Sequence, residues 1–337
     1  MRRLLLALSA IVALAACRDQ ARGGAGARDE IRAVGSSTVY PFTTLVAERF
    51  VADDPDAPAP VIETTGTGAG LRLFCAGLGA AYPDIADASR RITAAEYRIC
   101  ERNSVGPLLE VPIGLDGIAF AQARDGPDLR LTPALIYRAL AAAPGGRANR
   151  ARNWSDLDPA LPRTPILVYG PPATSGTRDA LVELVLLPGC RAVEPAAPRA
   201  RCTRLREDGA YADMGENDNL TVQKLAADPS ALGVLGYSYL EENAGVVRGA
   251  PLNGIAPSYS SIAGGLYPGS RPLYLYVKKN HLAAVPGLRR FLRLYAQDWG
   301  TAGPLVRRGL IASPPAVQVR AADVVARERP LDPAGLA

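Results

Sequence analysis

Apolar residues occur along the chain in two kinds of run. In the first, β-branched and other apolar residues follow one another directly, as at 165–169, which predicts a buried strand. In the second, apolar residues recur every three or four positions, as at Phe42, Leu45, Val46 and Phe50, which predicts a helix. Strands are expected at 31–34, 60–64, 84–86, 108–112, 115–121, 165–169, 233–237 and 273–278. Helices are expected at 41–51, 70–78, 94–102, 133–141, 178–187, 219–226 and 286–296. This alternation predicts an α/β fold.

Three of the expected strand-to-helix turns are rich in Ser, Thr and Gly. The residues concerned are Ser36, Ser37 and Thr38 in the first turn, Thr67 and Gly68 in the second, and Ser175, Gly176 and Thr177 in the third. The first amides of a helix have no partners inside it and carry partial positive charge, so they suit an anion. Each turn alone is better explained as an ordinary helix cap, for which Ser and Thr are favoured. The repetition of such turns favours a second interpretation, in which their hydrogen-bond donors converge on a tetrahedral oxyanion.

Two arginines and further polar residues stand beside these turns. Ser89 and Arg90 follow the strand expected at 84–86, Arg178 and Asp179 follow the third turn, and Asn217 precedes the helix expected at 219–226. An arginine can grip an oxyanion with two parallel hydrogen bonds. The alternative for each cluster is a capped helix start on a solvated surface.

The N-terminus has the pattern of an export signal. Arg2 and Arg3 precede an apolar run too short to span a bilayer, and small residues then lead to Cys17. This order resembles the lipobox of bacterial lipoproteins, which implies a signal peptide at 1–16 and acylation of Cys17. A plain secretory signal is the alternative. Residues 17–30 are expected to form a flexible tether.

Composition narrows the class of protein. Hydrophobic residues make up 48% of the 337 residues, enough for the cores of two domains. The formal net charge is +5, but the basic residues are scattered and not interleaved with aromatic ones, so we expect no nucleic-acid partner. No apolar run after the signal is long enough for a membrane-spanning helix.

Four cysteines remain after Cys17. In an exported chain disulfides are expected, and the sequence allows three pairings, of which we favour the neighbours: Cys75 with Cys100 and Cys190 with Cys202. A metal site is the rival interpretation. The spacings lack a Cys-x-x-Cys pair and the chain has one histidine, His281, which we expect at the surface, so neither a metal nor a cofactor is expected.

Several of these segments together resemble the phosphate-binding proteins of bacterial phosphate-specific ABC transporters. The matching segments are 33–41, 66–70, 88–90, 174–179, 233–237 and 267–273, in that order along the chain. The resemblance covers nearly all of residues 31–300.

The resemblance implies a periplasmic binding protein of the type II topology. Two lobes, each a mixed sheet flanked by helices, would be joined by two hinge crossings near 112–114 and 245–247. Lobe I would comprise 31–113 and 246–337, and lobe II 114–245. Inorganic phosphate would bind in the cleft of a monomer at Ser36, Ser37, Thr38, Thr67, Gly68, Ser89, Arg90, Ser175, Gly176 and Thr177, with Arg178 and Asn217 as further contacts. The partners implied are the permease subunits of the transporter and, through the lipid anchor, a membrane bordering the periplasm.

The chain departs from the family at two positions. Many members carry an Arg four residues before the Ser of the third turn, where this chain has Pro171, and an Asp where it has Ser89. A carboxylate that accepts the proton of phosphate must therefore come from elsewhere or be absent. Asp179 is the first candidate, followed by Asp87 and Asp218.

Other functions remain open on these patterns. Sulfate, molybdate or phosphonate would suit the same donors. A serine hydrolase would need a base for Ser175 or Ser37, and the chain has neither a second histidine nor a Gly-x-Ser-x-Gly elbow, so we expect no enzyme. A structural or adhesion lipoprotein would not need three donor-rich turns.

Overall fold

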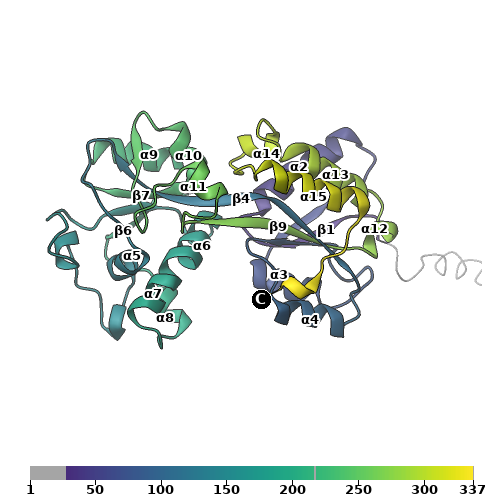
Figure 1. The fold of residues 1–337 in the computed structure, drawn as a ribbon, viewed down its shortest axis with the longest axis horizontal. Helices are drawn as coiled ribbons and strands as arrows, with labels where there is room; N and C mark the ends of the chain where they lie inside the picture. The colour runs from purple at the N-terminus through teal and green to yellow at the C-terminus, as the bar shows by residue number, and fades with distance from the viewer. Residues whose placement is uncertain (1–27, 216–217, 337) are drawn as a thin grey trace, which may run out of the picture.

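Two lobes lie side by side and are joined by two long strands (Figure 1). The computed structural model describes residues 28–215 and 218–336, so Cys17, the expected signal peptide and Asn217 lie outside the described residues. Strands are β1 (Arg32–Gly35), β2 (Val61–Thr64), β3 (Ile85–Ala88), β4 (Leu108–Ala123), β5 (Val168–Gly170), β6 (Tyr211–Asp213), β7 (Leu232–Gly236), β8 (Val247–Gly249) and β9 (Ser270–Lys278).

Helices flank these strands in both lobes. In the first half of the chain they are α2 (Tyr40–Asp53), α3 (Thr67–Phe74), α4 (Ala94–Arg102), α5 (Pro133–Leu140) and the short turns η1 (Pro144–Gly146) and η2 (Trp154–Asp156). The second lobe continues with α6 (Gly176–Ala180), η3 (Leu181–Leu186), α7 (Leu187–Val193), α8 (Arg199–Thr203), α9 (Asp218–Ala227), α10 (Tyr237–Glu242) and α11 (Tyr259–Ala263). The chain ends with α12 (His281–Ala284), α13 (Leu288–Asp298), α14 (Pro304–Arg307), α15 (Pro315–Arg327) and η4 (Pro333–Gly335).

A mixed sheet runs through both lobes in the order β2-β1-β3-β9-β4-β7-β5-β6, with β8 also paired to β4. The first lobe has β1 parallel to β2 and β3, and the second has β5 parallel to β6 and β7. The antiparallel strands β4 and β9 lie between these parallel sets. The expected fold class, two mixed α/β lobes, is therefore confirmed.

Strand β4 is the first crossing between the lobes. The two strands expected at 108–112 and 115–121 are one strand of 16 residues, whose register shifts between Pro112 and Gly114. Proline has no backbone N–H to give to a ladder, so an irregularity here is expected. The N-terminal part of β4 pairs with β9, and the C-terminal part pairs with β7 and β8.

The second crossing lies at the start of β9. Val247 and Tyr267 are buried in the same apolar core as Ile118, whereas Leu273 belongs to the core of the first lobe. Strand β8 stays in the second lobe because it pairs with the end of β4. We therefore place the crossing at Ser270, not at 245–247 as expected from the sequence, and extend the second lobe accordingly.

The helix expected at 178–187 is part of a longer run with a change of geometry in its middle. Residues Gly176–Ala180 and Leu187–Val193 are α-helical, and Leu181–Leu186 between them is a π-helix. The run continues through Gly189, where a Cβ atom would meet the carbonyl oxygen of Pro133 at 2.0 Å. Glycine at this position lets α7 lie directly against the start of α5.

A buried carboxylate holds the beginning of the first lobe together. Asp84 accepts hydrogen bonds from the Arg28 guanidinium at 2.5 Å and from the Arg32 backbone N–H at 2.7 Å. His281 is buried, not at the surface as expected, and its Nδ1 lies 2.6 Å from Asp84. Its Nε2 accepts the backbone N–H of Gly79 at 3.2 Å. Both ring nitrogens of the histidine are thus engaged within lobe I, and Arg28 ties part of the expected tether to the lobe.

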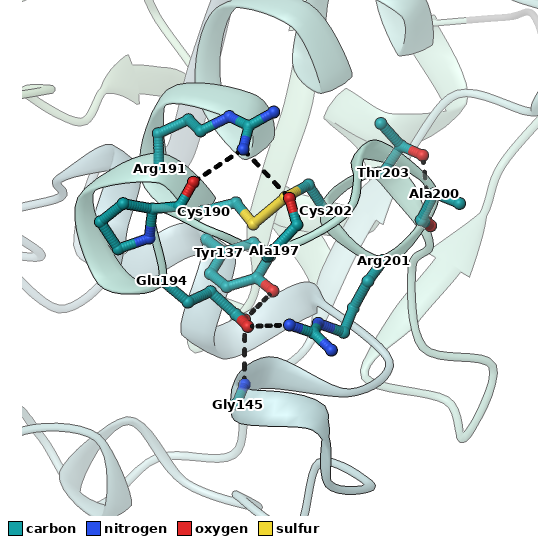
Figure 2. The surroundings of a disulfide bond; sticks show 11 residues. Tyr137, Gly145, Cys190, Arg191, Glu194, Ala197, Ala200, Arg201, Cys202 and Thr203 are labelled. Carbon is teal, nitrogen blue, oxygen red and sulfur yellow. Dashed lines mark hydrogen bonds and ion pairs between the residues drawn. A yellow bond between two sulfur atoms is a disulfide. The ribbon is translucent and has the colours of Figure 1, made fainter.

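The two expected disulfides are both present. Cys75 joins Cys100 at the end of α3, and Cys190 joins Cys202 between α7 and α8. Figure 2 shows the second bond beside Glu194, whose carboxylate accepts hydrogen bonds from Arg201 and from the backbone N–H of Gly145. Across the residues that the structure describes, none of the helices is long and apolar enough to cross a membrane.

Candidate functional site

Each of the three donor-rich turns lies directly before a helix. Two of the turns belong to lobe I and the third belongs to lobe II. Ser36, Ser37 and Thr38 connect β1 to α2, Thr67 begins α3, and Ser175 caps α6. Parallel strands place their carboxyl ends at one edge, which brings the turns after β1, β2 and β3 together. The ordinary capping role is also present, because the Ser175 hydroxyl accepts the Thr177 N–H at 3.2 Å.

The lobes touch each other through these turns. The Ser37 hydroxyl of lobe I donates to Asp179 Oδ2 of lobe II at 2.6 Å, and the Thr38 hydroxyl donates to the Gly176 carbonyl oxygen at 3.3 Å. A Cβ atom on Gly176 would lie 2.7 Å from the Cα of Thr38. The glycine that the sequence placed in the third turn therefore lets the two lobes approach at this point.

The remaining hydroxyls of lobe I form a second cluster beside α3. Thr67 and Ser89 are buried, their hydroxyl oxygens lie 3.0 Å apart, and the Ser89 N–H donates to Thr67 Oγ1 at 3.0 Å. A Cβ atom on Gly68 would lie 3.7 Å from a guanidinium nitrogen of Arg90. Thr67, Gly68, Ser89 and Arg90 are thus neighbours, as the sequence predicts.

Both arginines expected at the site have partners of their own. Arg90 makes two hydrogen bonds to Glu96, at 2.7 and 2.9 Å, and these bonds are the main reason why the pKa of its guanidinium is raised above its usual value. Arg178 lies over the ring of Tyr211, 4.5 Å from its centroid, and donates to the Pro171 carbonyl oxygen at 3.2 Å. Neither guanidinium stands free among the hydroxyls.

Arg178 instead lines a cavity on the second lobe. The cavity has a volume of about 500 Å³ and is also lined by Arg204, Arg206 and Asp213. Tyr211 forms part of its wall, and burial raises the pKa of its phenol to about 12. The cavity therefore borders the start of α6 from the side.

The structure adds an arginine that sequence reasoning missed. Arg271 is buried, and its guanidinium donates to Thr38 Oγ1 at 2.9 Å, to Glu183 at 2.7 Å and to Asp116 at 3.2 Å. The residue lies in segment 267–273, which resembles the family, but nothing in the local sequence pattern separates it from a surface arginine. Burial raises the pKa of the Asp116 carboxyl, and Arg271 acts in the opposite direction.

The three candidate proton acceptors have different surroundings. Asp179 accepts from Ser37 between the lobes. Asp218 accepts the N–H of Gly236 at 3.0 Å within lobe II. Asp87 is buried behind the first turn, where its Oδ2 accepts the Thr43 hydroxyl at 2.9 Å. Among the described residues, no group of three or more His, Cys, Asp or Glu side chains could hold a metal ion.

The contact between α3 and the first turn depends on a glycine. We predict that Gly70→Ala lowers the free energy of unfolding by about 1–3 kcal/mol, because its Cβ atom would lie 2.5 Å from the Cα of Gly35. Gly68→Ala is the matched control, since its Cβ atom would meet nothing nearer than 3.7 Å, the side chains of Arg72 and Arg90. Urea unfolding of both variants measures the difference. Equal stabilities would contradict this account of the contact.

Asp87 predicts a dependence of stability on pH. Burial raises the pKa of its carboxyl from 3.8 to about 7, so the folded state holds a proton that the unfolded state releases. Its contribution to stability therefore falls as the pH rises from about 4 to about 7. We expect Asp87→Asn, which keeps an acceptor for Thr43, to gain stability relative to wild type across this range.

The measurement is urea unfolding at pH 4 to 8, with the exposed Asp125→Asn as control. A difference between Asp87→Asn and wild type that stays constant with pH would show that Asp87 does not titrate in this range.

Comparisons with known proteins agree with this architecture. Residues 20–298 match the model of a PBP superfamily domain. Protein SphX of Synechococcus elongatus is 30% identical over 280 residues, which are 80% of this chain and 74% of that protein. Phosphate-binding protein PstS of Staphylococcus saprophyticus is 25% identical over 300 residues, 87% of this chain and 84% of its own.

Solved structures of similar proteins have the same fold as this chain. The possible phosphate-binding protein from Planctomyces limnophilus superposes with a TM-score of 0.73 at 25% identity, covering 88% of this chain and 98% of that one. The receptor of an ABC-type phosphate transporter from Vibrio cholerae, with a TM-score of 0.59 and 19% identity, shows the same fold. Since the family model matches most of the chain, the chain belongs to the PBP superfamily.

Proposed function

We propose that this protein binds inorganic phosphate between its lobes and delivers it to the permease of an ABC transporter. The observation that carries the proposal is the meeting of the donor-rich turns of the two lobes, at Ser37 with Asp179 and at Thr38 with Gly176. An anion held at this junction touches both lobes. It therefore binds the closed arrangement better than an open one and shifts the population towards closure.

The donors suit a tetrahedral oxyanion. The proposed contacts come from Ser36, Ser37, Thr38, Thr67, Gly68, Ser89, Ser175, Gly176 and Thr177, with Arg90, Arg178 and Asn217 as further candidates. Hydroxyl groups and helix amides of this kind can replace the water shell of an anion. The names of the relatives, a phosphate-binding protein PstS among them, support phosphate over other oxyanions.

Asp179 is the proposed acceptor for the proton of phosphate. Its Oδ2 accepts from Ser37 at the junction of the lobes, so the carboxylate stands where the anion would bind. Phosphate near neutral pH carries a proton that such a carboxylate can accept in a hydrogen bond. Sulfate carries none, and its oxygen would face the carboxylate without a hydrogen between them. A required hydrogen bond of this kind can discriminate by roughly 10⁴–10⁵.

We propose no catalysis for this site. Both ring nitrogens of His281 are engaged by Asp84 and Gly79 in lobe I, so the histidine is not available as a base for Ser175. The Ser175 hydroxyl accepts a backbone N–H as a helix cap, which gives it a structural role. A binding role accounts for the arrangement of Ser175 and His281, and no nucleophile is needed.

Selectivity tests the proposal directly. We predict that the wild type prefers phosphate to sulfate in competitive calorimetric titration, and that Asp179→Asn narrows this preference by about tenfold or more, because the amide group can donate to sulfate. The exposed Asp125→Asn in the same lobe is the matched control and should keep the wild-type preference.

Two results would count against this account. If the wild type binds sulfate as tightly as phosphate, the phosphate assignment fails. If Asp179→Asn keeps full selectivity while the wild type prefers phosphate, Asp179 is not the acceptor and only that part of the proposal fails.

We also propose that Cys17 carries a lipid that holds the mature protein at a membrane facing the periplasm. A triacylated N-terminus binds a bilayer far more firmly than one acyl chain does. Cys17→Ser should therefore move the protein from the membrane fraction to the soluble periplasmic fraction on cell fractionation. Arg18→Ala, which keeps the thiol, should stay in the membrane fraction. A Cys17→Ser protein that remains with the membrane would disprove the anchor.

A further inference from the structure

Arg271 contacts residues of both lobes beside the proposed site. The residue stands at the start of β9, where the chain crosses between the lobes, and its side chain is buried. Its guanidinium donates at 2.9 Å to Thr38 Oγ1 in the first turn of lobe I. The other two partners are carboxylates, Asp116 on β4 and Glu183 on the long helical run of lobe II.

Glu183 occupies an unusual backbone segment. It lies in the π-helix Leu181–Leu186, which separates α6 from α7. Such segments are rare and often occur at functional sites, because the wider turn changes which side chains face a given direction. Glu183 of lobe II reaches Arg271 at 2.7 Å while 36% of its side chain remains exposed.

A carboxylate at this place is unfavourable for an anion site unless it has another role. Glu183 lies near a second arginine of the site, because its charge contributes to the raised pKa of Arg90. Simple Coulomb repulsion would make its removal strengthen the binding of phosphate. The ion pair with Arg271 predicts the reverse, that removal of Glu183 weakens the binding of phosphate. The pair holds the Arg271 guanidinium against Thr38 and joins lobe II to the crossing strand β9.

We propose that Glu183 is a positioning residue that keeps the lobes closed over the bound anion through its ion pair with Arg271. The inference rests on the proposed function of the site and deepens it, by naming the contact that retains the ligand. Glu183 does not touch the anion in this account. It acts on Arg271, which orients Thr38, and Thr38 in turn contacts Gly176 of the opposite lobe.

The two roles of Glu183 predict opposite effects on binding kinetics. Loss of a closing contact raises the dissociation rate, whereas loss of a repelling charge raises the association rate. We expect Glu183→Gln to raise the dissociation rate of phosphate about tenfold, between the effects of exposed and buried ion pairs, with an association rate within about twofold of wild type. Stopped-flow measurement with inorganic phosphate gives both rates.

Two further variants separate contact from charge. Glu183→Asp keeps the charge but is one methylene shorter and cannot make the 2.7 Å contact, so it should behave like Glu183→Gln. Glu242→Gln removes an exposed carboxylate from α10 of the same lobe and should match the wild type. Faster association with unchanged dissociation in Glu183→Gln, wild-type rates in that variant, or wild-type rates in Glu183→Asp would each overturn the proposal.

A wrong proposed function would give a different experimental result from a wrong role for Glu183. If the wild type binds no phosphate, the phosphate assignment is wrong, and the closing contact is then measured without ligand. Spin labels on exposed positions of the two lobes, Leu73→Cys and Val193→Cys, report the distance between them. We expect Glu183→Gln to shift the population towards longer distances relative to Glu242→Gln. Identical distributions in the two variants would overturn the inference.

Discussion

The antiparallel pairing of β4 with β9 is the constraint on which the whole arrangement depends. Its register runs from Leu108 opposite Lys278 in lobe I to Gly117 opposite Ser270 at the edge of lobe II. Every other strand that the structure describes is attached to this pair directly or through one or two intervening strands. A change in the angle between the lobes must therefore be absorbed near the irregularity at Pro112 and Gly114, where the ladder is already interrupted.

The charges at the site are largely balanced within the protein. Arg90 is held by Glu96, and Arg271 by Asp116 and Glu183. An anion that enters meets hydroxyls and helix amides, and the guanidinium groups of Arg90 and Arg271 are already neutralised by carboxylates. Selectivity in such a site depends on which hydrogen bonds a ligand completes, because nearly all dianions of similar size would feel the same net charge.

The sequence predicted the local features and failed where contacts join distant segments. The strands of both lobes and the hydroxyl-rich turns were visible because alternation, apolar runs and turn chemistry are local signals. Strands β6 and β8 span three residues each, too short to produce such a pattern. Arg271 and Glu183 meet across 88 residues of sequence, and neither stands in a distinctive local pattern. The burial of His281 likewise depends on a carboxylate 197 residues away.

Pro171 shows how a backbone carbonyl oxygen can hold the side chain of a later residue in place. The Pro171 carbonyl oxygen accepts the Tyr211 hydroxyl at 2.7 Å and the Arg178 guanidinium at 3.2 Å. Stacking on Tyr211 fixes the plane of that guanidinium. A cation therefore stands beside residue 171 although it belongs to the following helix. The two residues are seven apart in the sequence, and the turn between β5 and α6 brings them into contact.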